Sequence, residues 1–118
     1  RCPEGMEWKA RACAGKPLFM PHPMAVARAT EEAARTGKGW RLPTMKELSG
    51  ITSVGDADPT AGVPAINPVA FPGTPPARFW TSSASGPHYF MYVGFRDGDV
   101  GENTRVTPAA IRLVRTAN

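Results

Sequence analysis

The spacing of apolar residues changes along the chain, from a helical period in the first half to alternation in the last third. Between residues 21 and 39, four apolar residues recur at intervals that place them on one face of a helix: Ala25, Val26, Ala29 and Ala33. Pro23 suits the first helical position, and Gly37 and Gly39 can end the helix. The pattern predicts a helix whose small side chains let it lie close to another element.

A short extended segment and a second helix are predicted directly after the first helix. Residues 40–42 are extended, since Pro43 biases the residue before it away from the helical region. Thr44 and Glu47 have the spacing of a capping box, in which each side chain accepts a hydrogen bond from the backbone N–H of the other. The helix is expected to run to about Ile51, with Glu47 as a cap and not a general acid.

Residues 52–78 contain six prolines and are expected to form a long ordered loop with a helical turn near 67–70. Four apolar residues in this loop are predicted to be buried: Val63, Ile66, Val69 and Phe71. Asp56 and Asp58 invite a calcium site, but the spacing lacks the remaining ligands of an EF-hand loop, so calcium stays the weaker alternative.

Alternation in the last third predicts four strands, at residues 78–85, 88–95, 99–106 and 109–115. Asp97-Gly98 supplies a hairpin turn between the second and the third. The strand at 88–95 has apolar residues on both faces, which is typical of a central strand covered on both sides. Trp40, Trp80 and Phe95 are expected in the core.

Two helices before a meander of antiparallel strands predict an α+β fold. A chain of 118 residues suits one domain, spanning residues 1–118, and buries roughly two thirds of the surface that its unfolded form exposes. We therefore expect two helices packed on a small twisted antiparallel sheet with long ordered loops.

Cys2 and Cys13 bracket a segment that we expect to be a hairpin, with strands at 7–9 and 17–20, closed by a disulfide. Closing a loop of this size stabilises by about 3 kcal/mol in the chain-entropy view and implies an oxidising compartment. The alternative is two free thiols in a cytosolic protein. Two cysteines do not make a zinc site, and no metal or cofactor is expected.

Charge narrows the classes of partner. The net charge is +4, from 14 Lys and Arg against 10 Asp and Glu, and ten of the cations are arginine. No run of Lys or Arg occurs, which argues against a nucleic-acid-binding arm. The sequence also lacks a run of 18 apolar residues, the length that a membrane-spanning helix needs. The balance fits either an ordinary solvated surface or attraction to sulfated or acidic glycans, which the planar guanidinium pairs well. Because the chain begins with Arg and has no leader pattern, either a signal peptide has been removed or the chain is a fragment of a longer protein, and we favour the fragment.

Several motifs stand in one order: RCPEGMEWKARAC, GWRLPTMKEL, INPVAFPGTPPARFWTSS, MYVGFRDGDV and IRLVR. This order resembles the bacterial DUF1566 family, the domain type found at the C-terminus of the Legionella collagen-like adhesin. The resemblance implies a C-type-lectin-like fold related to the formylglycine-generating-enzyme branch, with the two ends of the domain close together. It also implies a secreted or surface-exposed protein. The chain departs from the family at His22, where an aromatic residue is usual, and at Gly94, where a polar residue is usual.

The resemblance implies that the later loops and exposed strand faces form the ligand surface. In this sequence nine residues there are candidate ligand contacts: His88, Tyr89, Tyr92, Arg96, Asp97, Asp99, Glu102, Asn103 and Arg105. Such a mixture of polar and aromatic side chains suits adaptable recognition. In the competing interpretation Asp97 and Asp99 only build the turn and Tyr92 belongs to the core. Arg115 is expected in a structural ion pair.

No catalytic residues are predicted, because neither a Ser-His-Asp nor a Cys-His order occurs and the two histidines offer little acid–base chemistry. We therefore expect a non-enzymatic, lectin-like adhesion domain that binds a glycan or surface polymer outside the cell, at the bacterial surface or in the periplasm. The alternative is a structural cap of a pilus or stalk that binds its own kind or a protein partner.

Overall fold

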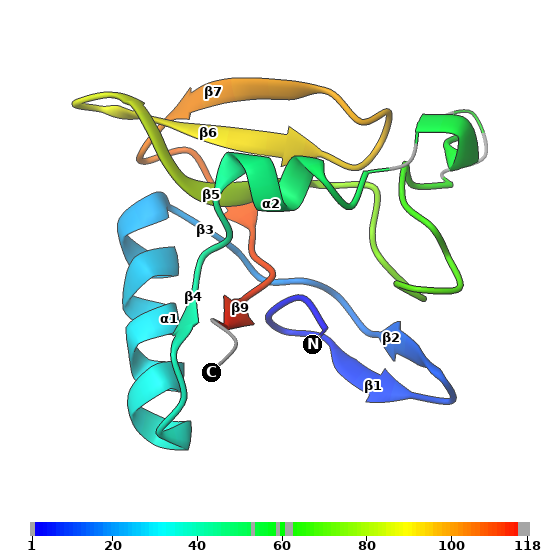
Figure 1. The fold of residues 1–118 in the computed structure, drawn as a ribbon, viewed down its shortest axis with the longest axis horizontal. Coiled ribbons are helices and arrows are strands. Elements are labelled where there is room, and N and C mark those ends of the chain that lie inside the picture. The colour runs from blue at the N-terminus through cyan, green and yellow to red at the C-terminus, as the bar shows by residue number, and fades with distance from the viewer. Residues whose placement is uncertain (1, 53, 59, 61–62, 116–118) are drawn as a thin grey trace.

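A mixed sheet with a helix on each face forms the centre of the molecule (Figure 1). The computed structural model describes residues 2–52, 54–58, 60 and 63–115. The helices are α1 (His22–Thr36) and α2 (Met45–Ser49), with a 3-10 turn η1 at Val54–Asp56. The strands are β1 (Glu7–Lys9), β2 (Ala12–Ala14), β3 (Phe19–Met20), β4 (Trp40–Arg41), β5 (Arg78–Gly86), β6 (Tyr89–Gly94), β7 (Val100–Thr104), β8 (Ala109–Ala110) and β9 (Val114–Arg115). The predicted α+β class is confirmed.

The main sheet has the order β3-β8-β5-β6-β7, and β1-β2 and β4-β9 form two separate two-stranded ladders. Strands β5, β6 and β7 form the predicted antiparallel meander. Strand β8 inserts between β3 and β5 and runs parallel to β5, with Phe79 opposite Ala110. The prediction of a purely antiparallel sheet is therefore wrong, because the chain returns after β7 to fill a gap left between two earlier elements.

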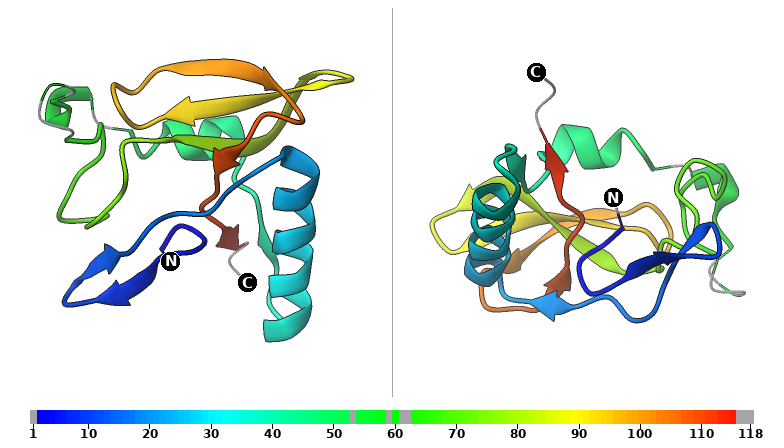
Figure 2. Two further views of the ribbon diagram at one scale, coloured as in Figure 1. Left: turned by 180° about the vertical axis from the view of Figure 1, so that it is seen from behind. Right: turned by 90° about the horizontal axis from the view of Figure 1, so that it is seen from below.

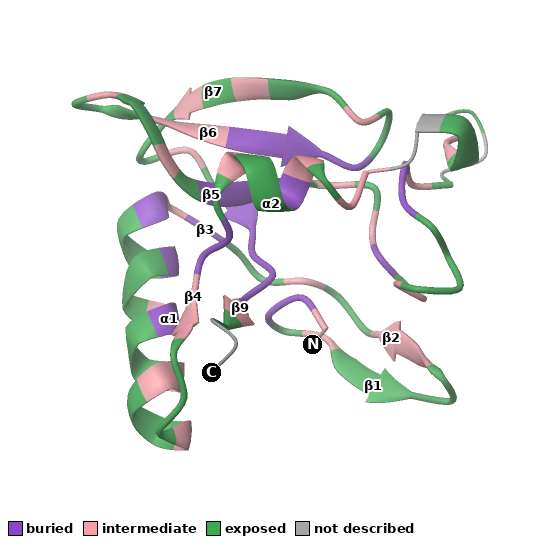
Figure 3. Ribbon diagram, in the orientation of Figure 1, coloured by how far each residue is buried: buried purple, intermediate pink, exposed green. Residues whose placement is uncertain are grey.

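Side chains from the two faces of the sheet form two apolar clusters. Successive residues of a strand point to opposite faces, so Phe79 and Trp80 enter different clusters. Trp80 meets α1 through Ala25 and Ala29, whereas Phe79 meets α2 through Leu48. Figure 3 shows the burial concentrated in β5, the second half of β6 and the inner face of α1. The sheet is thus covered on both sides, as the pattern of residues 88–95 predicts.

The predicted first helix is confirmed, with a start one residue earlier at His22. Gly37 ends it in the left-handed conformation (φ 69°) and donates its N–H to the carbonyl of Ala33. Ala25 and Ala29 are buried, whereas Val26, which the helical spacing places on the same face, is 45% exposed. Val26 lies one position round the helix from the buried row and lines a groove beside Trp40.

The capping box at the start of α2 is present. The Thr44 hydroxyl accepts the N–H of Glu47 at 3.2 Å, and Glu47 Oε1 accepts the N–H of Thr44 at 2.8 Å. Arg41 adds two bonds, from Nη1 and Nη2 to the same carboxylate, at 2.7 and 2.8 Å. The Arg41 guanidinium and the Thr44 N–H lower the pKa of Glu47 to about 2. The prediction of a structural Glu47 agrees with these bonds.

Three local predictions need correction. Strand β1 pairs with β2 and not with residues 17–20, because β3 is taken by β8 at the edge of the main sheet. In the long loop the turn at Asn67 is present and Ile66 is buried, but Val63 and Val69 are exposed. The predicted strand 109–115 splits into β8 and β9, which belong to different sheets.

His22 fills the position where an aromatic residue was expected, and its imidazole is buried. The ring stacks on Phe90 with centroids 3.5 Å apart and meets Trp80 edge-on at 5.1 Å. Nε2 lies 2.8 Å from the carbonyl oxygen of Thr81. His22 thus behaves as an aromatic core residue and does not loosen the packing, and its burial lowers the pKa of the imidazole.

We expect the domain to lose stability as the pH falls below about 6.5, the pKa of an unperturbed histidine. Since the folded-state pKa of His22 is lowered, the unfolded chain takes up a proton first and is favoured in acid. Urea unfolding between about pH 7.5 and about pH 5 should show this loss. His22→Phe should flatten the dependence, because it keeps an aromatic ring but removes the titrating group. Equal slopes for wild type and His22→Phe would contradict the assignment.

Candidate functional site

The nine predicted contact residues do not gather on one surface. Arg105 donates its N–H to the carbonyl of His88 at 2.9 Å, which places both beside Tyr89 at one end of the β6–β7 ribbon. Arg96 and Asp97 lie at the turn at the other end. The six residues of β6 separate these ends by about 20 Å, at roughly 3.3 Å per residue. A single small ligand cannot contact both groups.

The turn end is built largely by its own aspartates. Asp97 Oδ1 accepts the N–H of Asp99 at 3.1 Å, and this bond lowers the pKa of the Asp97 carboxyl. Partial burial and the neighbouring Asp97 raise the pKa of Asp99. The Asp99 carboxylate lies against Gly94, where any side chain would overlap it. A side chain at residue 94 would require that carboxylate to move aside, and Arg96 is the exposed cation at this turn.

Three further residues of the nine lie within strands β6 and β7, and of these one is buried, one exposed and one half-buried. Tyr92 is only 7% exposed and belongs to the cluster under α1, with the Arg78 guanidinium 4.6 Å from its ring centroid. Tyr92 is therefore a core residue and not a ligand contact. Glu102 pairs with Met91 and Asn103 with Phe90, so the two side chains point to opposite faces of the sheet. Glu102 is exposed and Asn103 is half-buried.

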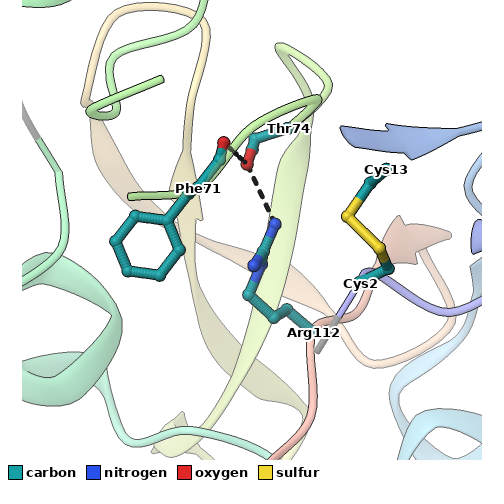
Figure 4. Close-up of a disulfide and its surroundings, with 5 residues drawn as sticks. All are labelled: Cys2, Cys13, Phe71, Thr74 and Arg112. Carbon is teal, nitrogen blue, oxygen red and sulfur yellow. Dashed lines mark hydrogen bonds between the residues drawn. A yellow bond between two sulfur atoms is a disulfide. The ribbon is translucent and has the colours of Figure 1, made fainter. Parts of the chain in front are cut away.

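Arg112 is a candidate site residue that the sequence interpretation missed. Its side chain is 6% exposed, lies between the buried Ile111 and Leu113 in sequence, and donates from Nη2 to the Thr74 hydroxyl at 2.9 Å. The guanidinium lies 5.4 Å from the centroid of the Phe71 ring (Figure 4). Burial lowers its pKa to about 10. An arginine inside the run Ile-Arg-Leu was the available signal, because a buried arginine is rare.

Arg115, for which an ion pair was predicted, is exposed and lies over the ring of Trp40, with 5.7 Å between the guanidinium carbon and the ring centroid. The register of β4 and β9 places the two residues opposite each other. Trp40 itself is half-buried at the edge of the α1 cluster, so its predicted core position is only partly correct, whereas Trp80 and Phe95 are fully buried.

The disulfide-closed hairpin lies beside Arg112. The predicted bond between Cys2 and Cys13 is present. Strands β1 and β2 project from the molecule on the side away from α1 (Figures 1 and 2). The Cys13 N–H bonds to the carbonyl of Pro72 at 3.0 Å, which ties the hairpin to the long loop. A cavity of about 160 Å³ lies at this junction, lined among others by the disulfide, Trp8, Phe71, Pro72 and Arg112.

Two wider apolar grooves flank α1. One, of about 340 Å³, lies between α1 and β4 and includes Val26, Trp40 and Leu42. The other, of about 320 Å³, lies between α1 and the edge strand β3 and includes Leu18, Phe19 and Met24, all exposed. Because the residues named in both grooves are apolar, the grooves are better suited to contact with another apolar surface than to catalysis.

Across residues 2–52, 54–58, 60 and 63–115, no three His, Cys, Asp or Glu side chains come together in a way that could hold a metal ion. Thr60 donates to Asp58 Oδ1 at 2.7 Å within the loop considered for calcium. Within the same residues no helix has the length and hydropathy needed to cross a bilayer.

A family model, the Lcl C-terminal domain, matches residues 3–115 of the chain. The chain belongs to the Lcl C-terminal domain family. Membership suggests a surface-related role for this Lcl C-terminal domain, and the disulfide is compatible with a location outside the cytoplasm. Comparison with curated proteins and with solved structures finds no match. The C-type-lectin-like assignment, the DUF1566 label and the kinship with the formylglycine-generating-enzyme branch remain predictions.

Proposed function

We propose that this Lcl C-terminal domain is a non-enzymatic recognition domain of an extracellular or bacterial cell-surface protein, and that it binds an anionic glycan or another anionic surface polymer. The observation that carries the proposal is the exposure of cationic side chains on several separate elements: Lys9, Arg11, Lys16, Arg96, Arg105 and Arg115. Cations spread in this way suit an extended polyanion, which can contact several of them at once, better than a small ligand.

The disposition of the reactive side chains supports binding over catalysis. Cys2 and Cys13 are joined in a disulfide, so neither offers a thiolate nucleophile. His22 is buried among aromatic rings with Nε2 at a backbone carbonyl. His88 is exposed at the end of the ribbon, on no cavity described above. A nucleophile within reach of a base, the usual mark of acyl or phosphoryl transfer, is not among these arrangements.

The second candidate function is that of an assembly cap for a pilus or stalk. The groove beside β3 favours it, because Leu18, Phe19 and Met24 are 42%, 55% and 59% exposed on one surface. Clustered exposed apolar side chains at a sheet edge are typical of protein–protein contact. In this case the domain would recognise a copy of itself or another protein.

Retention on an immobilised sulfated polysaccharide, measured against salt concentration, tests the first proposal. We expect tight retention at low salt that falls steeply as salt rises, because exposed charges are screened. Neutral dextran should not retain the domain. Arg96→Gln with Arg105→Gln should weaken binding by about two- to fivefold per residue, the effect of about 0.5–1 kcal/mol for an exposed pair. Lys38→Gln, at an exposed lysine after α1, is the control.

The outcomes separate the two candidates. Retention that is indifferent to salt would reject the anionic polymer. A stable oligomer by size-exclusion chromatography, together with no retention on any polysaccharide, would favour the assembly cap. A stable oligomer that is dissociated by Phe19→Asp would assign the contact to the groove beside β3.

A further inference from the structure

Trp8 is the most exposed of the three tryptophans, and it faces the cavity at the base of the hairpin. Its side chain is 63% exposed, whereas Trp80 is fully buried and Trp40 half-buried. Trp8 pairs with Cys13 across the ladder, so both side chains share one face of the hairpin, and both line the cavity of about 160 Å³. An exposed indole beside a cavity buries little on folding and is positioned for a ligand.

Arg112 supplies a positive charge in the wall of the same cavity. Only 6% of its side chain is exposed, and the Phe71 ring lies along its guanidinium (Figure 4). Nη2 of the guanidinium donates to the Thr74 hydroxyl at 2.9 Å, which holds the side chain in the wall of the cavity. The guanidinium carries a positive charge in the wall of the cavity, and this charge attracts an anion placed there.

The hairpin is held rigidly over the cavity. The disulfide closes it, and the Cys13 N–H bonds to the carbonyl of Pro72. Its turn places Ala10 and Arg11 at φ 52° and 67°, a left-handed conformation that costs about 1–2 kcal/mol for a residue with a side chain. Positive φ at both residues is the geometry of a two-residue hairpin turn, which joins β1 to β2 and so sets Trp8 opposite Cys13.

We propose that this cavity, named here the hairpin subsite and formed by Trp8, Phe71, Pro72, Arg112 and the disulfide, binds the acidic group of a hexuronate-type sugar. The cavity of about 160 Å³ is smaller than the roughly 300 Å³ typical of whole small-molecule sites, so it takes the carboxylate and not the entire sugar. The sugar ring lies outside it, with its apolar face on the exposed indole of Trp8. This inference rests on the proposed recognition of an anionic glycan and names one sugar class for it.

The test is a titration of the whole domain with three separate probes: glucuronate, glucose and acetate. The indole N–H resonance of Trp8, assigned by loss in Trp8→Phe, reports occupancy in heteronuclear NMR. We expect a saturable shift with glucuronate, in the millimolar range, and much weaker shifts with glucose, which lacks the acid, and with acetate, which lacks the ring.

Trp8→Ala should reduce the affinity for glucuronate about tenfold or more, as expected for loss of a central aromatic contact, observed through the Arg112 side-chain resonances. Phe19→Ala, at an exposed aromatic residue on β3, is the matched control and should bind as the wild type does. Unchanged binding by Trp8→Ala, or equal shifts with glucose and glucuronate, would overturn the hairpin subsite.

Failure of this inference is distinguishable from failure of the proposed function. If glucuronate produces no shift while the sulfated polysaccharide still retains the domain in a salt-dependent way, the hairpin subsite is wrong and polymer recognition stands. If glucuronate binds with the expected dependence on Trp8 while no polysaccharide is retained, the subsite is upheld and the polymer proposal fails.

Discussion

Trp80→Ala is expected to lower the free energy of unfolding by about 3–5 kcal/mol, the range for a buried tryptophan truncated to alanine. The Trp80 side chain is fully buried and contacts both the sheet and α1. Its Nε1 donates to the carbonyl of Met20 at 2.8 Å, so truncation also leaves that carbonyl without this donor. His22 loses its edge-on contact at the same time. The variant therefore removes the residue that joins β3, α1 and β5.

A loss of this size is a large part of the 5–15 kcal/mol that typically stabilises a domain, so the variant should be partly unfolded at moderate temperature. Urea unfolding followed by far-UV circular dichroism measures the change without depending on tryptophan fluorescence. Trp80→Phe keeps an aromatic ring but removes the bond to Met20, and should lose about 1–3 kcal/mol. Trp8→Ala should lose less than about 0.5 kcal/mol. A Trp8→Ala variant as unstable as Trp80→Ala would contradict the assigned core.

The helices could be predicted from sequence because their start and stop signals are local. Thr44 and Glu47 form a capping box within four residues, and the structure has both of its bonds. Gly37 ends α1 in the left-handed conformation, as expected for a glycine that directly follows a helical pattern. The exposure of Val26 was not predictable, since helical spacing indicates an apolar side but not how far the neighbouring strand β4 extends over it.

The non-local pairings could not be predicted. The alternation in 109–115 marks extended, largely buried backbone, which is correct, but it does not say which sheet each part joins. Ala110 pairs with β3 and β5, whereas Val114 pairs with β4, about 70 residues earlier in the chain. The intervening Ile111–Leu113 passes through the core between the two sheets. For the same reason residues 17–20 were predicted to pair with residues 7–9, whereas β3 pairs with β8.

The candidate site was missed for a related reason. Strand alternation on 88–95 and 99–106 tells which side chains share a face but not which face is covered, so Tyr92 was placed among the contacts although α1 lies over it. Arg112 and Trp8 are over a hundred residues apart in the chain and line the same cavity only because the hairpin folds back on the long loop. Composition indicated many arginines without showing that one of them is buried.

Gly73→Ala is expected to detach the disulfide-closed hairpin and to lower the free energy of unfolding by about 3 kcal/mol or more, from left-handed strain together with a backbone clash. Gly73 has φ 81°, and a Cβ there would overlap the Cys13 carbonyl oxygen and lie 2.7 Å from its nitrogen. Those are backbone atoms that the disulfide and the bond to Pro72 hold in place, so they cannot move aside as a flexible side chain would.

Two glycine controls separate the two sources of the loss. Gly37→Ala has the same left-handed strain with open space around it and should cost about 1–2 kcal/mol, while Gly39→Ala has neither strain nor contact and should cost nearly nothing. Amide hydrogen exchange at Cys13 should rise sharply in Gly73→Ala alone, because its bond to Pro72 is broken. Since Trp8 is carried on the same hairpin, glucuronate binding should fall in that variant and remain in the other two. The expectation would be contradicted if Gly73→Ala and Gly37→Ala lost the same free energy of unfolding and the Cys13 amide stayed protected from exchange. The hairpin would then not depend on the close approach at Gly73.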